Sequence, residues 1–149
     1  MNFQDQLNSK LKAAMREKNK VALESLRAIK SAILLLQTQP GAKETPDDAE
    51  ITKLLQKLVK QRKESASIFR EQGRVDLAEP EEAQIEIISQ FLPEQLSAEE
   101  VEKVIDEVIQ SVAATTMKEM GKVMGMANKQ LAGKADGKLI AEIVKKRLD

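Results

Sequence analysis

Two glycines and two lysines share a short stretch near the C-terminal end of the chain. Gly121 and Gly125 lie four residues apart within an apolar pattern that predicts a helix, and Lys122 and Lys129 lie on one side of that helix. A glycine inside a helix costs about 1 kcal/mol relative to alanine, so some gain should offset it. Close packing against a neighbouring helix is the interpretation we favour. Close approach of a ligand backbone is the alternative, because glycine permits both.

The next segment is a glycine-punctuated turn, Gly-Lys-Ala-Asp-Gly-Lys at 133–138. Free backbone N–H groups where a helix begins can bind phosphate. Asp136 can satisfy the same groups as an N-cap, and its carboxylate would repel a phosphate. We therefore predict that the backbone of this turn is structural, with Lys134 and Lys138 free to contact a polyanion. The turn is not a Walker motif, because the Gly-Lys-[Ser/Thr] sequence is missing.

Three cations, Lys145, Lys146 and Arg147, lie near the C-terminal end of the sequence. Cations are also favourable at the C-terminal end of a helix, where they interact with the helix dipole. The chain has three Phe and no Trp or Tyr, so it offers no aromatic platform for stacking single-stranded bases. A bound nucleic acid should therefore be a folded RNA, recognised by its shape and phosphates. The candidate nucleic-acid-binding residues are Gly121, Lys122, Gly125, Lys129, Lys134, Lys138, Lys145 and Lys146.

Enzyme chemistry is hard to assemble from this sequence. There is no Cys and no His, which removes the thiol nucleophile, the commonest general base and the commonest transition-metal ligand. The serines occupy ordinary helical positions, and the paired glutamates suit first helical turns. We predict no catalytic residue, no metal and no cofactor. The longest apolar run, 32–36, is too short to span a bilayer, so we expect a cytoplasmic protein without membrane contact.

Charge is balanced overall but unevenly distributed along the chain. Lys plus Arg and Asp plus Glu number 24 each. Residues 1–38 and 117–149 each carry a net charge of +4 and residues 51–74 one of +5, whereas residues 94–116 carry −5. A neutral protein with such blocks can still present a positive face to a polyanion. Most charge runs are solvated surface, and that is the reading we favour for the lysines of 51–74.

Apolar residues recur with helical spacing almost throughout, which predicts an all-α fold. The first predicted helix uses Phe3, Leu7, Leu11 and Met15 as its apolar face. A second helix ends before Pro40, and a loop at 39–46 leads to a third, which runs from after Asp47 and Asp48 to about Gly73. Pro80, placed in a first turn, is predicted to open the fourth helix.

Pro93 is the predicted boundary between two parts, 1–92 with four helices in hairpins and 93–149 with three short helices. Ser97 and Glu100 have the spacing of a capping box, which would start the first helix of the second part. Gly133 suits the position just after the next helix, and Asp136 suits the N-cap of the last. A unit of about 55 residues is marginal on its own core, so it would dock on the first part or work on a partner.

Several of these segments resemble the GatB/YqeY family. Its YqeY members are similar over nearly the whole chain, and the similarity to GatB covers about residues 94–149. The residues that carry the resemblance are Met-Gly-Lys-Val-Met-Gly at 120–125, the stretch 133–140, Val-Lys-Lys-Arg-Leu at 144–148, Leu-Glu-Ser-Leu-Arg-Ala-Ile-Lys-Ser-Ala at 23–32 and Phe-Leu-Pro-Glu-Gln-Leu at 91–96.

The resemblance implies a two-part helical architecture and tRNA binding. GatB is the tRNA-facing subunit of a glutamine-dependent aminoacyl-tRNA amidotransferase, and its helical tail contacts the body of the tRNA. That implication rests on Gly121, Val123 and Met124, on Gly-Lys-Ala at 133–135, and on the lysines between them. GatB also has a large catalytic domain with metal and nucleotide sites, which this sequence lacks. Carbon–nitrogen ligase activity is therefore implied by family association only.

Three hypotheses follow for the function. The leading one is a tRNA-binding accessory protein linked to glutamine-dependent tRNA amidation, with tRNA and a protein of tRNA handling as partners. The alternative is a protein–protein adaptor without RNA binding, in which the acidic 94–116 segment or the basic third helix contacts a partner protein. A third hypothesis is an enzyme that takes part directly in amide transfer.

Overall fold

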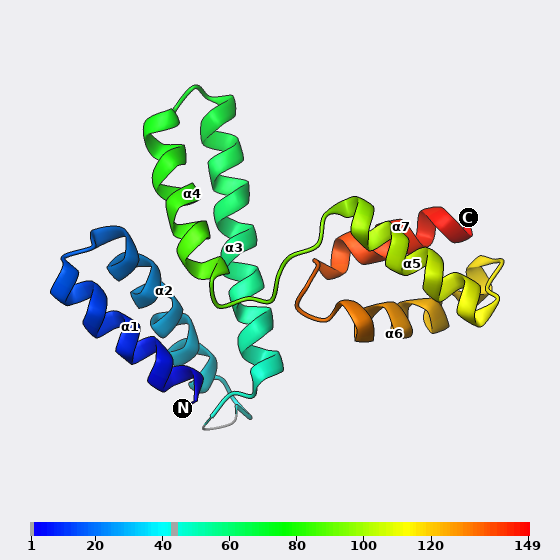
Figure 1. Ribbon diagram of the computed structural model, residues 1–149, viewed down its shortest axis with the longest axis horizontal. Helices are drawn as coiled ribbons and strands as arrows, with labels where there is room; N and C mark the ends of the chain where they lie inside the picture. The colour runs from blue at the N-terminus through cyan, green and yellow to red at the C-terminus, as the bar shows by residue number, and fades with distance from the viewer. Residues whose placement is uncertain (1, 43–44) are drawn as a thin grey trace. The chain divides into compact units, whose positions relative to one another are not determined.

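The computed structural model describes residues 2–42 and 45–149, and every element among them is helical. The all-α prediction is therefore confirmed. Lys43 and Glu44, in the predicted 39–46 loop, lie outside the described residues. The chain divides into two compact units, Met1–Leu92 and Pro93–Asp149 (Figure 1). In the part of the chain that the structure describes, no helix is both long and apolar enough to cross a membrane.

The N-terminal unit consists of two helical hairpins. Its helices are α1 (Phe3–Glu17), α2 (Lys20–Gln37), α3 (Asp48–Glu71) and α4 (Val75–Ser89). Helix α1 pairs with α2, α3 pairs with α4, and α4 also packs on α2 (Figure 1). Apolar residues from all four helices form one core, which includes Leu11, Ile29, Leu55, Val59 and Ile88.

Short polar side chains begin three of these helices. Asn2, Asn19 and Asp47 each accept a hydrogen bond from the backbone N–H three residues later, at distances of 2.8, 3.1 and 2.8 Å. These bonds satisfy N–H groups that have no partner within the helix. Two residues, Lys18 and Asn19, suffice to link α1 to α2, because Lys18 adopts the left-handed conformation that ends α1.

Two predictions for this unit are wrong. Met15 is 57% exposed, and Ala14 lies in the core instead, because the buried face of α1 follows a spacing of four and then three from Leu7. Helix α4 begins at Val75, so Pro80 lies inside the helix. Gly73, with φ of +72°, lets the N–H of Arg74 donate to the carbonyl of Phe69 at 2.7 Å, and the next helix starts at once.

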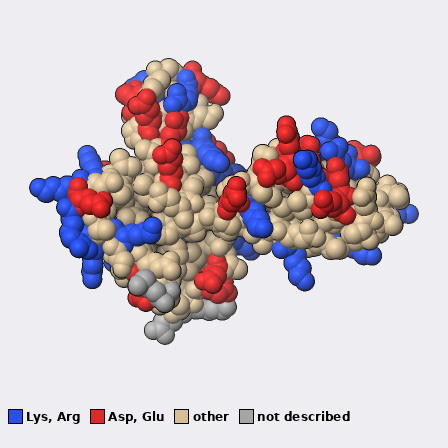
Figure 2. Space-filling model, in the orientation of Figure 1, with Lys and Arg blue, Asp and Glu red and all other residues tan. Residues whose placement is uncertain are grey.

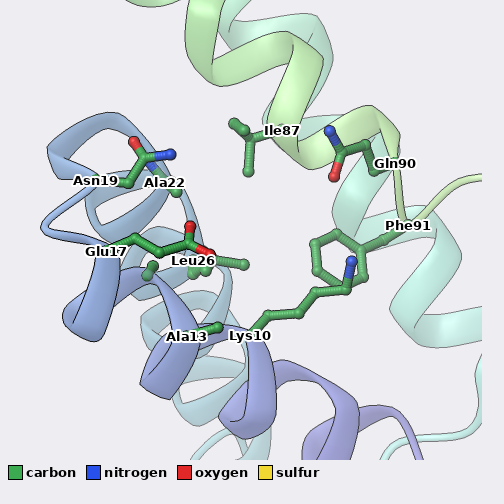
Figure 3. Close-up of a pocket in the computed structure, with 10 residues that line it drawn as sticks. Lys10, Ala13, Glu17, Asn19, Ala22, Leu26, Ile87, Gln90 and Phe91 are labelled. Atoms are coloured by element: carbon green, nitrogen blue, oxygen red, sulfur yellow. The ribbon is translucent and has the colours of Figure 1, made fainter.

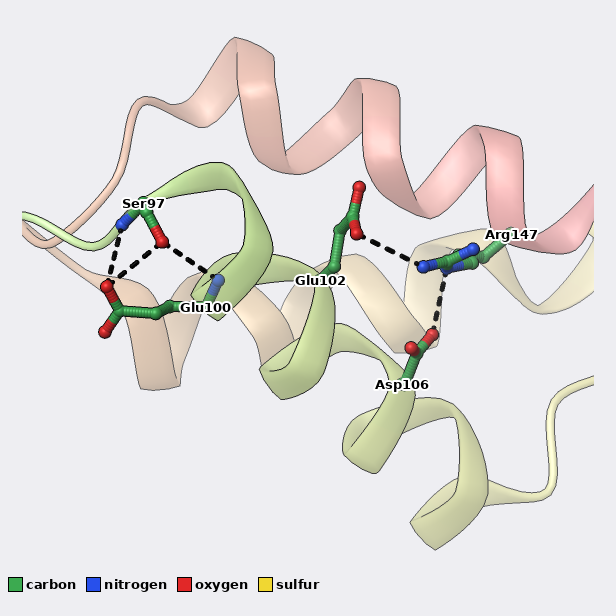
Figure 4. Close-up of polar contacts among 5 residues, drawn as sticks. All are labelled: Ser97, Glu100, Glu102, Asp106 and Arg147. Atoms are coloured by element: carbon green, nitrogen blue, oxygen red, sulfur yellow. Dashed lines mark hydrogen bonds and ion pairs between the residues drawn. The ribbon is translucent and has the colours of Figure 1, made fainter.

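The C-terminal unit contains α5 (Ala98–Val112), a short 3-10 turn η1 (Met117–Glu119), α6 (Met120–Leu131) and α7 (Gly137–Leu148). The three α-helices pack pairwise around a separate core, which includes Val101, Ile105, Val123, Leu131 and Val144. The predicted capping box at Ser97 and Glu100 is present (Figure 4). Each unit thus has an apolar core of its own.

Candidate nucleic-acid interface

Helix α6 has one buried side and one exposed side. Val123, Ala127 and Leu131 are buried in the core of the C-terminal unit. Positions three, four and seven apart share a side of a helix, so Lys122, Gly125 and Lys129 lie together on the opposite side, with Gly121 at its edge. All four of these residues are exposed. The structure therefore places the glycines and lysines of α6 on a surface facing solvent.

The two helical glycines do not pack against a neighbouring helix. A Cβ atom added to Gly121 or Gly125 would meet nothing within 4 Å. The packing interpretation of these glycines is therefore wrong, because the helix contacts the core through Val123 and Ala127 on its other side. Nothing within the described residues offsets the roughly 1 kcal/mol that each glycine costs a helix. The result is a strip of exposed helical backbone with Lys122 and Lys129 beside it.

The turn between α6 and α7 is held by its own backbone and by the start of the C-terminal unit. Gly133 has φ of +75°, as predicted for a residue just past a helix end. Its carbonyl accepts a 2.6 Å hydrogen bond from the Gln95 amide, and the carbonyl of Lys134 accepts one of 2.9 Å from the N–H of Leu96. Asp136 caps α7, with its carboxylate 3.4 Å from the N–H of Lys138. The predicted structural role of the turn is confirmed.

Helix α7 separates its cations into two groups. Lys138 and Lys145 lie seven residues apart on its exposed side, with Lys146 adjacent and Glu142 between them. Arg147 points the other way: it contacts Glu102 at 3.5 Å and Asp106 at 3.0 Å on α5 (Figure 4). Part of the acidic 94–116 segment thus neutralises a cation of its own unit.

The predicted lysines of this region are exposed. Among the described residues, no ion pair involves Lys122, Lys129 or the four predicted lysines of the turn and α7. An exposed cation without a fixed partner can exchange its solvent counterions for phosphates at little structural cost. We call the set Gly121, Lys122, Gly125, Lys129, Lys134, Lys138, Lys145 and Lys146 the α6–α7 surface.

Comparison with known proteins identifies the family of this chain. A family model described as a Yqey-like protein matches residues 4–148. The chain belongs to the YqeY family. A curated relative, altered inheritance of mitochondria protein 41 of Pyrenophora tritici-repentis, is 34% identical over 132 residues, which cover 87% of this chain and 71% of that protein.

The YqeY chain also matches part of a larger enzyme over a shorter stretch. One subunit of the glutamyl-tRNA(Gln) amidotransferase of Thermococcus gammatolerans is 46% identical over 57 residues, and its counterpart in Aeropyrum pernix is 40% identical over 57 residues. Each match covers 36% of this chain and 9% of the amidotransferase subunit. These matches support the relation between the YqeY family and the glutamyl-tRNA(Gln) amidotransferases.

One neighbouring cation was missed by the sequence reasoning. Lys118 is exposed in η1, four residues before Lys122, and no ion pair within the described residues involves it. The spacing of four residues between Lys118 and Lys122 indicates that they share a side of a helix, but the sequence pattern does not predict a helical element at 117–119. This YqeY chain therefore carries one more cation beside the exposed side of α6.

A groove in the N-terminal unit offers little for catalysis. It has a volume of about 200 Å³ and lies between α1, α2 and the end of α4 (Figure 3). Lys10 and Glu17 are the only titratable residues in its lining, and the Lys10 ammonium lies 5.1 Å from the centre of the Phe91 ring. Within the described residues, no cluster of acidic side chains could hold a metal ion.

Proposed function

We propose that this YqeY-family protein binds folded tRNA through the α6–α7 surface. The observation that carries the proposal is the exposed backbone at Gly121 and Gly125, where an added Cβ atom would meet nothing within 4 Å. Lys122 and Lys129 lie beside this strip and project from the same side of the helix. The combination lets a phosphate backbone approach the helix closely while cations contact its charges.

The mode of binding follows from the residue types on this surface. It has no aromatic side chain, so it cannot stack single-stranded bases. Its charged side chains are all lysines, flexible point charges that lack the planar fork with which arginine makes bidentate contacts. What remains is recognition of shape and phosphate, which suits a folded RNA.

The identity of the RNA is suggested by the relatives. The matched amidotransferase subunit belongs to an enzyme named for glutamyl-tRNA(Gln), and the length of the match, 57 residues, is close to that of the C-terminal unit. On that basis we propose an accessory role in glutamine-dependent tRNA amidation. The match covers 9% of the amidotransferase subunit, so amide transfer itself is not part of the proposal.

The test is a titration of labelled total tRNA with the full chain, followed by fluorescence anisotropy at about 50 and about 200 mM salt. We expect binding that weakens steeply with salt. Replacing Lys122, Lys129 and Lys134 by Ala should weaken it about tenfold or more at the lower salt. The matched control replaces Lys53, Lys57 and Lys63 of α3 by Ala. These three lysines are also exposed, and the control variant loses the same number of positive charges.

The control decides what a loss of affinity means. If both triple variants lose the same affinity, tRNA responds only to total charge, and the α6–α7 surface is not an interface. If the unsubstituted protein shows no binding at low salt, the adaptor hypothesis leads instead. Pull-down from lysate with and without RNase would then test it, because a protein partner survives the RNase treatment.

A further inference from the structure

A second group of cations lies at the end of the N-terminal unit where α1 meets α2. Lys12 and Arg16 lie on the outer side of α1, Lys18 forms the link and Lys20 begins α2. All four are exposed, and no ion pair within the described residues involves them. Figure 2 shows Lys and Arg side chains gathered at this end of the hairpin. We call these four residues the hairpin cluster.

The acidic residues near this cluster are few. Glu17 lies in the last turn of α1, and Glu24 lies in the second turn of α2. Glu24 is 3.5 Å from the side-chain amide of Gln84 on α4. Two carboxylates therefore stand against four cations in these turns, and the end of the hairpin keeps a net positive charge.

Two of the four residues are types that the fold itself disfavours at their positions. Lys18 has φ of +54°, a conformation that strains any residue with a Cβ and is usually taken by glycine or asparagine. Lys20 is the first residue of α2, where the positive end of the helix dipole opposes a cation. Folding thus gains nothing from a lysine at either position. The gain should come from something that the lysines bind.

We propose that the hairpin cluster is a second contact for the phosphates of a folded RNA, used together with the α6–α7 surface. This inference rests on the proposed function, because it assigns the same class of ligand to the other unit. Two basic surfaces on one chain bind a single polyanion more tightly than either does alone, since the second contact forms at a high effective concentration.

An RNA fits this cluster better than a membrane surface does. Peripheral membrane helices insert an apolar face into the interface. The apolar faces of α1 and α2 are buried in the core of their own unit, and the large apolar side chains exposed near the cluster are Met15 and Val21, at 57% and 37%. Little is therefore available to insert. The cluster itself has no aromatic residue, and Phe3 and Phe91 contact each other with ring centres 5.5 Å apart, so the cluster offers no platform for base stacking.

The test compares full-length variants in the tRNA titration at several salt concentrations. Replacing all four residues of the hairpin cluster by Gln should weaken binding about tenfold and reduce the salt slope by about 2 to 4, near one unit for each lost phosphate contact. The Lys53/Lys57/Lys63 variant, made with Gln, is the control and should bind as the unsubstituted protein does. A second variant, Lys18→Gly, separates binding from folding: its Tm should rise because glycine relieves the strain, while its affinity for tRNA falls.

Each outcome decides a different point. If the hairpin variant binds tRNA like the control while the Lys122/Lys129/Lys134 variant is weakened, this inference is wrong and the proposed function stands. If only the hairpin variant is weakened, the hairpin cluster binds RNA without the α6–α7 surface, and both the joint contact inferred here and the proposed interface are wrong. If the hairpin variant keeps its affinity for tRNA but loses binding to vesicles that contain phosphatidylserine, the cluster is a lipid contact and the inference is wrong.

Discussion

The α3–α4 hairpin and the α6–α7 surface are both rich in cations, but they use them differently. Arg70 forms a bidentate ion pair with Glu82, and Arg74 forms one with Asp76. Arg62 donates to the side chain of Gln84 at 2.9 Å. On the α6–α7 surface, by contrast, every cation is a lysine. Arg62 and Arg70 tie α3 to α4, and Arg74 pairs within the start of α4, whereas the lysines leave their charge to solvent.

This difference shows why net charge alone is a poor guide to an interface. Residues 51–74 carry a larger net charge than residues 117–149, yet the arginines among them hold intramolecular partners. Arginine presents a fixed fork that suits bidentate pairs, whereas lysine is a flexible point charge. The pairs also lower the pKa of Glu82 and of Asp76, because each carboxylate accepts hydrogen bonds from its guanidinium. Free lysines beside an exposed glycine backbone, not total charge, distinguish the α6–α7 surface from α3.

The largest expected effect comes from the separate cores of the two units. Ile105→Ala removes a fully buried side chain from the C-terminal core and should cost about 2 to 5 kcal/mol. That loss is comparable to the whole stability of so small a unit. Hydrogen exchange followed by mass spectrometry should then show lost protection in α5, α6 and α7 only. Ile29→Ala, the matched change in the other core, should affect α1 to α4 only. Equal loss in both units for either variant would contradict separate cores.

A smaller effect is expected from the exposed glycine strip. Gly125→Ala should raise the free energy of unfolding by up to about 1 kcal/mol, because alanine favours the helix and its methyl group meets open space. Gly125→Leu should also keep the fold. Both should weaken tRNA binding, the leucine variant more, because a side chain would hold the phosphate backbone away from the helix. Urea unfolding and the tRNA titration measure the two quantities. An unchanged affinity for the leucine variant would rule out close backbone approach at this position.

The sequence predicts the fold better than it predicts the surface. Helical spacing, Ser97 with Glu100 and the turn at Gly133 indicate local structure directly, because each depends on neighbouring residues. The predicted first-turn position of Pro80 is wrong. Proline is commonest in a first turn, but the turn at Gly73 starts α4 at Val75, five residues before Pro80. The side of α6 on which the glycines lie was also misjudged, since the pattern alone does not show whether another helix covers it. Which cations have partners depends on tertiary contacts such as those of Arg147.

The neighbours Lys146 and Arg147 allow the comparison to be repeated within one helix. Arg147→Gln should lower stability by about 0.2 to 1 kcal/mol, the usual contribution of partly exposed ion pairs, because it loses Glu102 and Asp106. Lys146→Gln should leave stability nearly unchanged. In the tRNA titration the order of the two variants should reverse: Lys146→Gln should lose about twofold or more in affinity, and Arg147→Gln should lose none. Urea unfolding and anisotropy on the same samples measure both. If Arg147→Gln weakens binding more than Lys146→Gln does, paired and free charge are not distinguished by the RNA.

The smallest effect is expected from acid, at the ion pairs of the α3–α4 hairpin. Arg70 holds the pKa of Glu82 below its ordinary value of 4.5, so the folded protein favours the ionised carboxylate. The stabilisation that this provides is complete above about pH 5 and is lost as the pH falls through the lowered pKa. Glu82→Gln should therefore have a slightly lower Tm than the unsubstituted protein at pH 7, and the two should converge in stronger acid. The Lys122/Lys129/Lys134 variant keeps the Arg70–Glu82 pair intact, so its Tm should not converge with that of the unsubstituted protein in this way. If the difference in Tm between Glu82→Gln and the unsubstituted protein persists below the lowered pKa, Glu82 stabilises the fold through packing and not through its charge. The ion pair would then not distinguish Arg70 from the lysines of the α6–α7 surface.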